Sequence, residues 1–407
     1  MAGPLAGVKV LDLSRVLAGP WAGQLLADLG ADVIKVERPG AGDDTRGWGP
    51  PYLKDKDGNE TGEAGYYLSA NRGKRSIAID ISKPEGQAVI HKLARRADVL
   101  LENYKVGGLK KYGLDYESLK AECPGLVYCS VTGFGQTGPY SDRAGYDFMI
   151  QAMGGLMSIT GERDDKPGGG PQKVGVAVSD LTTGLYGVIG ILAALRHRDQ
   201  TGEGQHIDMA LLDVTLGLLG NQNMNWFIGD VVPKRQGNAH ANIVPYQDFA
   251  TSDGHIILAA GNDRQFKAFC EVAGDPALAE NPRFATNRSR VENRDALVPL
   301  VAALIAKKTT AEWIAILEDV AVPCGPINTI PQAFADPQVV SRGLAFELDH
   351  PLSGKVPQVA CPIKFSGTPI TYEKAPPLLG QHSDEILAEL GFNAEEIGAL
   401  KSGGAIG

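Results

Sequence analysis

Short apolar runs separated by polar and glycine-rich segments dominate the first third of the chain. Such runs are typical of strands that are buried on both faces of a sheet. Between two of them, Ile90, Leu93, Ala94 and Ala97 recur at helical spacing after Pro84. Alternating strands and helices predict an α/β protein with a parallel, doubly wound, Rossmann-like sheet. The expected strands cover residues 8–13, 33–36, 77–81, 99–101 and 126–131.

The middle of the chain carries the most apolar helical pattern. Residues 161–175 are rich in Gly, Asp, Lys and Pro, which is loop composition, and they lead into Val178-Ser-Asp-Leu. Leu181, Leu185, Val188 and Leu192 then form one stripe, and other apolar residues fill much of the remaining circumference. A helix that is apolar nearly all round is expected to be buried. We expect it to end near residues 196–198 and a second apolar helix to cover residues 211–219.

The pattern changes after about Asn225. Asp253-Gly254 between two apolar runs predicts a β-hairpin. Helices are expected at 264–272, 294–306 and 311–320, the last starting with a capping box of Thr309 and Glu312. The tail offers one strand at 359–366 and one helix from Ser383, too little for a core of its own. We therefore expect a large domain at 1–224, a small α+β domain at 225–330, and a return segment at 331–407 that completes the large domain.

Composition limits the cellular compartment and the kinds of binding partner that we expect for the protein. With 39 basic and 48 acidic residues the net charge is −9, so no overall positive field attracts nucleic acid or an anionic membrane. The five cysteines are odd in number and form no C-x-x-C pair, which favours a reducing, cytoplasmic compartment. The N-terminus has no targeting pattern. The most apolar stretch, residues 188–195, is shorter than the roughly 18 residues of a membrane span. We expect a soluble protein that binds neither nucleic acid nor membranes.

Several common catalytic motifs are absent from the sequence. It contains no phosphate-binding G-x-x-x-x-G-K-[ST] loop, no dinucleotide-binding G-x-G-x-x-G and no G-x-S-x-G. Its seven histidines lack the spacing of metal ligands. We therefore predict no metal site and no permanently bound cofactor.

Several longer strings in the sequence are distinctive. They are Leu11-Asp-Leu-Ser-Arg-Val-Leu-Ala-Gly-Pro, Gly42-Asp-Asp-Thr-Arg, Asn71-Arg-Gly-Lys-Arg-Ser, Ala97-Asp-Val-Leu-Leu-Glu-Asn, Ala144-Gly-Tyr-Asp, Val178-Ser-Asp and Leu379-Gly-Gln-His. Together these strings resemble the family III CoA-transferases, which include formyl-CoA and carnitine CoA-transferases, and the resemblance extends over essentially the whole chain. Three segments, at residues 40–46, 239–247 and 376–382, are most similar to members that exchange CoA between dicarboxylates such as succinate and glutarate.

The resemblance implies an architecture and a reaction that residue patterns alone do not give. Family members form interlocked homodimers in which two chains thread through each other. The substrates are an acyl-CoA and a free carboxylic acid, so CoA enters as a thioester substrate. In this reaction Asp180 attacks the donor thioester, the released thiolate forms an aspartyl-CoA thioester, and the acceptor acid takes the CoA through a second anhydride.

Asp180 also has a role that its position alone suggests. It lies at the expected start of a helix, where the helix dipole and free amides favour a charged carboxylate. This would keep Asp180 ionised and nucleophilic near neutral pH. The alternative is that Asp180, or Ser179, simply caps the helix, because Asp and Ser are common N-cap residues.

The resemblance also implies residues that contact CoA. The basic ones are Arg38, Lys105 and Lys111, which suit the phosphates of CoA in an acidic protein. The sequence departs from formyl-CoA transferase here, because Lys111 replaces an arginine and Thr132 and Ser82 replace lysines. Each of these lysines could instead be a solvated surface charge. The other expected contacts are Leu17, Ala18, Ile79, Asn103, Tyr104 and Phe134.

Substrate recognition is expected to involve a further group of residues. Arg46 and His240 are candidates for binding the second, non-reacting carboxylate of a dicarboxylate, and His240 could alternatively be an ordinary hydrogen-bonding residue. Gly261 and Asn262 belong to the segment that matches the family's glycine-rich loop.

Tyr146 distinguishes this chain from one branch of the family. Tyr146 stands where the related α-methylacyl-CoA racemases have a histidine, and a tyrosine with a pKa near 10 is poorly suited to a two-base proton transfer. Tyr146 could also simply pack in the core. A racemase and a non-catalytic CoA-binding protein are the alternatives to a transferase.

Overall fold

The computed structural model describes residues 3–407 and divides into two compact units. The first unit comprises the described residues up to 156 together with 174–221 and 340–407, and the second comprises residues 157–173 and 222–339. Compared with the domain boundaries expected from the sequence, the loop at 157–173 belongs with the second unit, and the return to the first unit begins at Val340. The chain therefore passes between the units four times.

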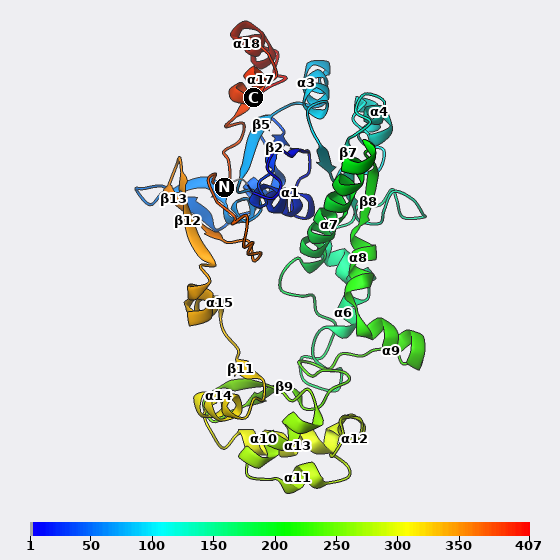
Figure 1. The fold of residues 1–407 in the computed structure, drawn as a ribbon, viewed down its shortest axis with the longest axis vertical. Coiled ribbons are helices and arrows are strands. Elements are labelled where there is room, and N and C mark those ends of the chain that lie inside the picture. The colour runs from blue at the N-terminus through cyan, green and yellow to red at the C-terminus, as the bar shows by residue number, and fades with distance from the viewer. Residues whose placement is uncertain (1–2) are drawn as a thin grey trace. The chain divides into compact units, whose positions relative to one another are not determined.

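The first unit is built around a six-stranded sheet in the order β5-β2-β1-β6-β7-β8 (Figure 1). Every neighbouring pair in it is parallel. In chain order this is the 3-2-1-4-5-6 arrangement of a doubly wound Rossmann-like sheet, as predicted. The strands are β1 (Lys9–Asp12), β2 (Asp32–Glu37), β5 (Lys74–Ala78), β6 (Val99–Glu102), β7 (Val127–Thr132) and β8 (His206–Ala210).

Each face of this sheet carries its own apolar core. One core joins Leu11, Leu100 and Tyr128 to α3 and α17, and the other joins Val33 and Leu101 to α1 and α7. The helices of the unit are α1 (Ala18–Asp28), α2 (Gly65–Leu68), α3 (Pro84–Ala94), α4 (Tyr116–Lys120), α5 (Asp147–Met153), α7 (Val178–Thr201), α8 (Leu211–Leu218), α17 (Ser383–Glu389) and α18 (Ala394–Ser402), with short 3-10 turns η1 (Asp44–Gly47) and η2 (Lys110–Tyr112).

Two antiparallel hairpins complete the first unit: β3 (Tyr52–Lys54) with β4 (Glu60–Ala64), and β12 (Ala345–His350) with β13 (Gly354–Val359). The predicted strand at 359–366 is wrong, because β13 ends at Val359. The predicted helix from Ser383 is confirmed.

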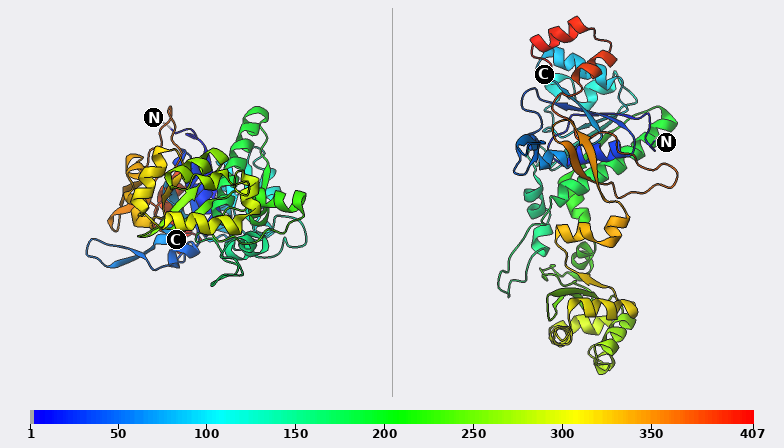
Figure 2. Two further views of the ribbon diagram at one scale, coloured as in Figure 1. Left: turned by 90° about the horizontal axis from the view of Figure 1, so that it is seen from below. Right: turned by 90° about the vertical axis from the view of Figure 1, so that its left-hand side faces the viewer.

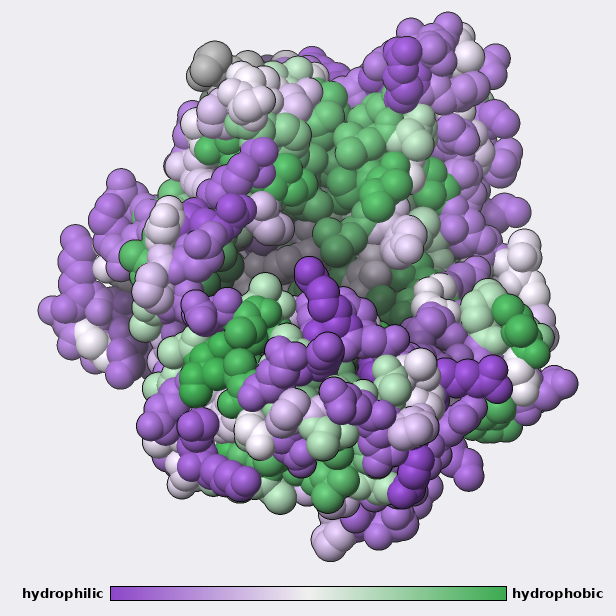
Figure 3. Space-filling view, turned by 60° about the horizontal axis from the view of Figure 1, so that its bottom comes forward, coloured by the Kyte–Doolittle hydropathy of each residue, from purple (hydrophilic) through white to green (hydrophobic). Residues whose placement is uncertain are grey.

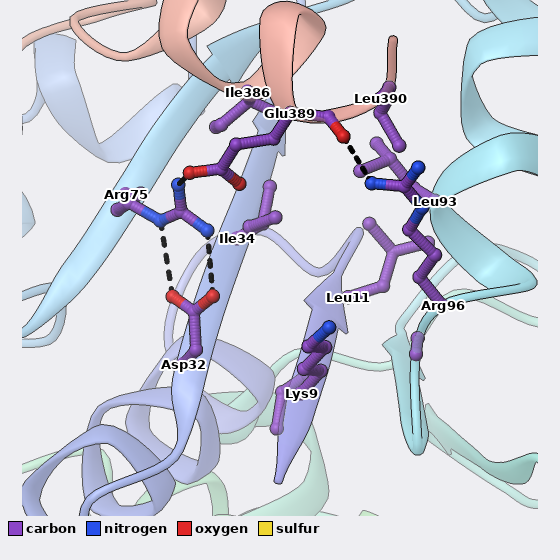
Figure 4. A pocket seen from close by; sticks show the side chains of 12 residues that line it. Lys9, Leu11, Asp32, Ile34, Arg75, Leu93, Arg96, Ile386, Glu389 and Leu390 are labelled. Atoms are coloured by element: carbon purple, nitrogen blue, oxygen red, sulfur yellow. Dashed lines mark hydrogen bonds and ion pairs between the residues drawn. The ribbon is translucent and has the colours of Figure 1, made fainter. Parts of the chain in front are cut away.

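The C-terminal helices pack against the sheet near α3, as the right-hand view of Figure 2 shows. Arg75 of β5 forms ion pairs with Asp32 of β2 and with Glu389 of α17, at 2.6 and 2.8 Å. Arg96 donates to the Glu389 carbonyl. These groups line a small pocket in which Lys9 and Asp32 mark the amino ends of β1 and β2 (Figure 4). The pocket therefore lies at the opposite edge of the sheet from the carboxyl ends of the strands.

Helix α7 is only partly buried, so the prediction of a fully buried helix is wrong. Ser179, Val188 and Ile191 face the core, whereas Leu185, Tyr186 and Ile189 are exposed, Ile189 by 61%. This helix is long and apolar enough to cross a membrane by length and composition, with 44% of its most apolar window buried in the protein. A single such helix is weak evidence for a membrane span, since core helices of soluble proteins pass the same test. Exposed apolar side chains gather in green patches among the purple polar ones in the space-filling view (Figure 3).

The second unit is a small α+β structure with its own core around Phe249, Leu258, Phe266 and Trp313. Its three-stranded antiparallel sheet has the order β11-β10-β9, and the predicted hairpin at Asp253-Gly254 joins β9 to β10. The predicted capping box of Thr309 and Glu312 starts α14. The elements are α6 (Leu156–Ile159), α9 (Asn221–Gly229), β9 (Tyr246–Ala250), β10 (His255–Ala259), α10 (Asp263–Val272), α11 (Ala277–Glu280), α12 (Asn287–Glu292), α13 (Arg294–Ile305), α14 (Thr310–Asp319), β11 (Cys324–Pro326), α15 (Ile330–Ala335) and α16 (Pro337–Ser341).

Candidate active site

The carboxyl ends of the parallel strands gather the residues expected to bind CoA. Leu17 and Ala18 begin α1 after β1, and residues 103–105 follow β6, its neighbour on the other side. The chain leaves β1 and β6 toward opposite ends of the sheet, so this is the switch point at which open α/β sheets bind ligands. Asn103 ties the two loops together, because its side chain accepts from Arg15 N at 2.8 Å and donates to Arg15 O at 2.6 Å.

The other expected CoA residues differ in how accessible they are. Arg38, Lys105 and Lys111 are exposed, whereas the Ile79 side chain is 2% exposed and packs in the core. Ile79 pairs its backbone with Ile406, so its side chain does not line an open surface. Arg38 follows β2, and Asp80 follows β5. Hydrogen bonds from Ser82 lower the pKa of the Asp80 carboxyl, and the charges of Lys83 and Arg38 lower it further.

Further groups at the same edge of the sheet follow β6 and β7. Tyr104 N donates to the Glu102 carboxyl at 2.7 Å. Lys105 lines a hollow with Lys110 and His206. Phe134 follows β7 and lies edge-on to Tyr140 at 5.5 Å between ring centroids.

Asp180 lies in the first turn of α7, next to this edge of the sheet. Helices α7 and α1 pack closely at Gly184, where a side chain would begin 2.7 Å from the Ala18 carbonyl oxygen. Gly184 is one turn beyond Asp180, so the contact brings the start of α7 to the start of α1. The structure thus places Asp180 near Leu17 and Ala18.

The expectation that Asp180 or Ser179 caps α7 is wrong. The N-cap position is Ala177, and it has no side-chain cap. The acceptor comes from a different element: Asp147, the first residue of α5, accepts from Ser179 N at 2.8 Å and from Asp180 N at 3.3 Å. Its second oxygen accepts from Gln151 at 2.6 Å. Asp147 therefore satisfies the free amides of α7 and leaves the Asp180 carboxyl available.

Asp180 has an unusual electrostatic environment. Burial raises its pKa to about 7, and the neighbouring Asp147 carboxylate adds to the rise. The expectation that the helix start keeps Asp180 fully ionised is therefore not met, because desolvation and a like charge outweigh the helix dipole. Within residues 3–407 nothing donates a hydrogen bond to the Asp180 carboxyl. A carboxyl with a pKa near neutrality and free oxygens suits a nucleophile.

Two aromatic residues that sequence reasoning missed lie near the carboxyl pair. Burial raises the pKa of the Tyr66 hydroxyl, and the charges of Asp180 and Asp147 add to this rise, so the phenol lies within electrostatic range of both. Trp48 meets the Tyr66 ring edge-on, with centroids 5.1 Å apart, and is 43% exposed. No motif marks Tyr66, and only tertiary structure places it beside Asp180.

Tyr146 is 64% exposed at the start of α5, so the alternative that it packs in the core is wrong. Backbone contact between Gly145 and Gly133 positions it, since a side chain on Gly133 would begin 2.5 Å from the Gly145 Cα. Gly133 directly follows β7. Tyr146 therefore stands beside Asp147 at the same edge of the sheet.

Arg46 is held in an internal ion-pair network. It pairs with Glu37 at 2.7 Å and with Glu63 at 3.0 Å, donates to the Pro377 carbonyl at 2.9 Å, and lies over the Tyr67 ring. Its donor groups are therefore occupied by the protein itself.

His240, Gly261 and Asn262 belong to the second unit. The His240 ring accepts from Asn242 N at 3.0 Å, and its pKa is lowered by burial and by Arg294. Gly261 N donates to Gln265, and Asn262 is the side-chain N-cap of α10. No group of three or more potential metal-ligating side chains occurs in the described part of the chain.

A parallel sheet of Rossmann topology, with a carboxyl group of raised pKa next to its switch point, defines an α/β protein of the class that binds ligands at this edge of the sheet. The family model for CoA-transferase family III matches residues 5–383, and the chain belongs to this family. It is therefore a CoA-transferase by family.

Similar proteins agree with this assignment. The chain is 54% identical over 387 residues to a succinate–glutarate CoA-transferase from Agrobacterium fabrum, covering 95% of this chain and 96% of that one. It is 46% identical to the human succinyl-CoA:glutarate CoA-transferase, covering 99% of this chain and 90% of that one. A CAIB/BAIF family crystal structure from Brucella suis is 51% identical, with a TM-score of 0.84, covering 96% of this chain and 100% of that one.

Proposed function

We propose that the protein transfers CoA from succinyl-CoA to a free dicarboxylate such as glutarate. The observation that carries the proposal is the Asp180 carboxyl beside the loops at the switch point. Within the described residues it accepts no hydrogen bond, and its pKa is raised to about 7. The names of its relatives support the substrate class.

The steps of the proposed reaction use one carboxylate throughout. Asp180 attacks the thioester carbonyl, which forms a mixed anhydride and expels the CoA thiolate. The thiolate then attacks the aspartyl carbonyl, which gives aspartyl-CoA and releases succinate. Attack of the acceptor carboxylate on aspartyl-CoA and return of the thiolate yield the new acyl-CoA and regenerate Asp180. The overall reaction breaks one thioester bond and forms another, so no ATP is required.

The local geometry supports a division of roles between the two acidic residues. Asp147 holds three N–H groups and orders the start of α7, whereas Asp180 has none and is free to react. The phenol of the half-buried Tyr66 lies within range of both carboxylate charges, and the exposed Tyr146 directly precedes Asp147. Position 146 holds a tyrosine and not a histidine, which supports transfer over racemisation.

The proposal is tested by incubating the protein with succinyl-CoA and a panel of free acids and separating the acyl-CoA products. We expect glutaryl-CoA from glutarate, and an Asp180→Asn variant slower by at least about a thousandfold, because the nucleophile is lost. Wild-type protein that forms no new CoA ester from any acid contradicts the proposal. Mass spectrometry of the protein mixed with succinyl-CoA alone should show CoA attached to the tryptic peptide that contains Asp180.

We also propose that the protein acts as the interlocked homodimer typical of its family. The apolar side chains exposed on α7, together with Leu216 and Leu218 of α8, support a surface that a second chain covers. The five cysteines are all unpaired, which supports the proposal of a cytoplasmic location.

A further inference from the structure

The loop between β1 and α1 contains a strained residue. Val16 has φ of +72°, in the left-handed region that a β-branched side chain rarely adopts. Leu17, which follows it, is the N-cap of α1 and offers no side-chain cap. Strain of this kind disfavours a conformation by on the order of 10- to 100-fold and persists only where the surroundings impose it.

Asp43 is the group that imposes it. One carboxylate oxygen of Asp43 accepts from Val16 N at 3.2 Å and from the backbone N of Thr45 at 3.0 Å. The other oxygen pairs with Lys35 at 2.8 Å, and both side chains are fully buried. The same ammonium group donates to the Ser14 carbonyl at 2.9 Å. One buried ion pair thus holds the loop at Ser14 and at Val16.

The segment that carries Asp43 is itself fixed. Asp43 N donates to the Glu37 carboxylate at 3.0 Å, and Glu37 in turn pairs with Arg46. Asp44 pairs with Arg15 at 3.1 Å, so the segment contacts the loop a second time. Burial alone would raise the pKa of Asp43, but Lys35 and the Thr45 hydrogen bonds lower it to about 2. Asp43 therefore remains charged at neutral pH.

We propose that Asp43 is a positioning residue for the acyl-CoA substrate: by holding Val16 in the left-handed conformation, it sets the backbone of Leu17 and Ala18 at the start of α1. This inference rests on the proposed function, because it assigns the CoA contact to Leu17 and Ala18. An ion pair that only stabilised the fold would not require a strained Val16 directly before Leu17 and Ala18, the residues to which we assign the CoA contact.

The test measures KM for succinyl-CoA, kcat, and direct binding of CoA by calorimetry in Asp43→Asn. The amide keeps an oxygen for Val16 N but loses the charge that pairs with Lys35. We expect KM and the CoA dissociation constant to rise about tenfold while kcat changes less than about threefold, since a loosened loop weakens binding of ground state and transition state alike.

A second substitution separates positioning from general destabilisation. Glycine adopts φ of +72° without strain, so Val16→Gly in the Asp43→Asn background should restore CoA binding to within about threefold of wild type. Asp55→Asn, which removes an exposed carboxylate in the β3–β4 hairpin, is the matched control and should leave all three measurements unchanged.

Should Asp43→Asn fail to fold, Val16→Pro tests the same idea with the buried pair intact, because proline excludes a positive φ and lacks the N–H. It should weaken CoA binding at least tenfold. The inference is overturned if Asp43→Asn and Val16→Pro bind CoA as the wild type does, or if Val16→Gly gives no rescue. Failure of the proposed function is distinct: the wild type would then bind CoA without transferring it.

Discussion

At the scale of single residues, two neighbouring carboxyl groups at the start of α7 have different tasks. Asp147 accepts from the amides of Ser179 and Asp180 and from Gln151, whereas Asp180 accepts none. Burial and the charge of Asp147 raise the pKa of Asp180 to about 7. In enzymes, two carboxyl groups that lie in different environments often have different roles in the reaction.

The shift predicts how activity depends on pH. Only the deprotonated carboxyl attacks a thioester, so the rate of CoA transfer should rise as pH increases through about 7, where Asp180 loses its proton. In Asp147→Asn the like charge is gone, so the pKa of Asp180 falls and this limb moves to lower pH. Profiles of kcat/KM measured from about pH 5 to about pH 9 show both effects.

Asp142→Asn is a suitable control, because it removes an exposed carboxylate from the loop that leads to Tyr146. Its profile should match that of the wild type. A limb that stays in place in Asp147→Asn would show that some other group governs the rate.

The sequence located Asp180 through its resemblance to a family, but not the residues that control it. Asp147 is 33 residues away from Asp180 in the chain, and Tyr66 lies on a short helix after the β3–β4 hairpin. Neither belongs to a pattern of spacing. Arg46 illustrates the converse, since its charge suggested a carboxylate ligand and the fold supplies Glu37 and Glu63 instead.

At the scale of elements, α7 combines a buried face with an exposed apolar one. The sequence pattern predicted burial correctly for Val188 and Ile191 but not the exposure of Leu185 and Ile189. Apolar residues all round a helix indicate that most of its surface is buried against other groups, which can belong to the same chain or to another chain.

The exposed face of α7 gives a prediction about association. Ile189→Asp should cost the isolated fold little, because the side chain is 61% exposed. In a dimer that covers this face, the buried charge should weaken association by about a hundredfold or more. Light scattering coupled to size exclusion would show a shift from dimer to monomer.

His197→Asp places the same charge on an exposed position near the end of α7 and should leave the dimer intact. If Ile189→Asp remains as dimeric as the wild type, this face of α7 is not the covered one.

Other elements show which signals the sequence carries. Four of the five expected strands of the sheet lie within about one residue of their predicted bounds, because continuous apolar runs mark strands buried on both faces. The strand expected at 77–81 lies at Lys74–Ala78 instead, because its first residues, Lys74 and Arg75, are charged although they are buried. β8 was missed, since His206, Asp208 and their neighbours alternate polar and apolar at the edge of the sheet. The β12–β13 hairpin was missed for a similar reason, because few of its side chains are buried.

At the scale of the whole molecule, each unit has a core of its own. Trp313 is almost fully buried in the second unit and donates to the Ile305 carbonyl at 2.7 Å. Leu100 is fully buried in the first unit. The sequence predicted two such bodies from the change of pattern near Asn225, but a loop of seventeen residues, at 157–173, joins the second unit without any apolar pattern to mark it.

Separate cores predict local responses to core substitutions. Trp313→Ala should cost about 3–5 kcal/mol and speed hydrogen exchange chiefly in residues 222–339. Leu100→Ala should cost about 2–5 kcal/mol and act chiefly on the strands of the first unit. Hydrogen exchange followed by mass spectrometry distinguishes these patterns from a uniform loss of protection, which would indicate one cooperative body.

The four passages of the chain between the units have a consequence for protein engineering. The second unit is made of two stretches separated by residues 174–221, and those residues carry both Asp180 and the edge strand β8. A chimera that exchanges the second unit between relatives must therefore be assembled from two grafts that leave the segment of Asp180 in place. Recombination at a single crossover point within residues 9–339 would divide either the second unit or the strands of the sheet.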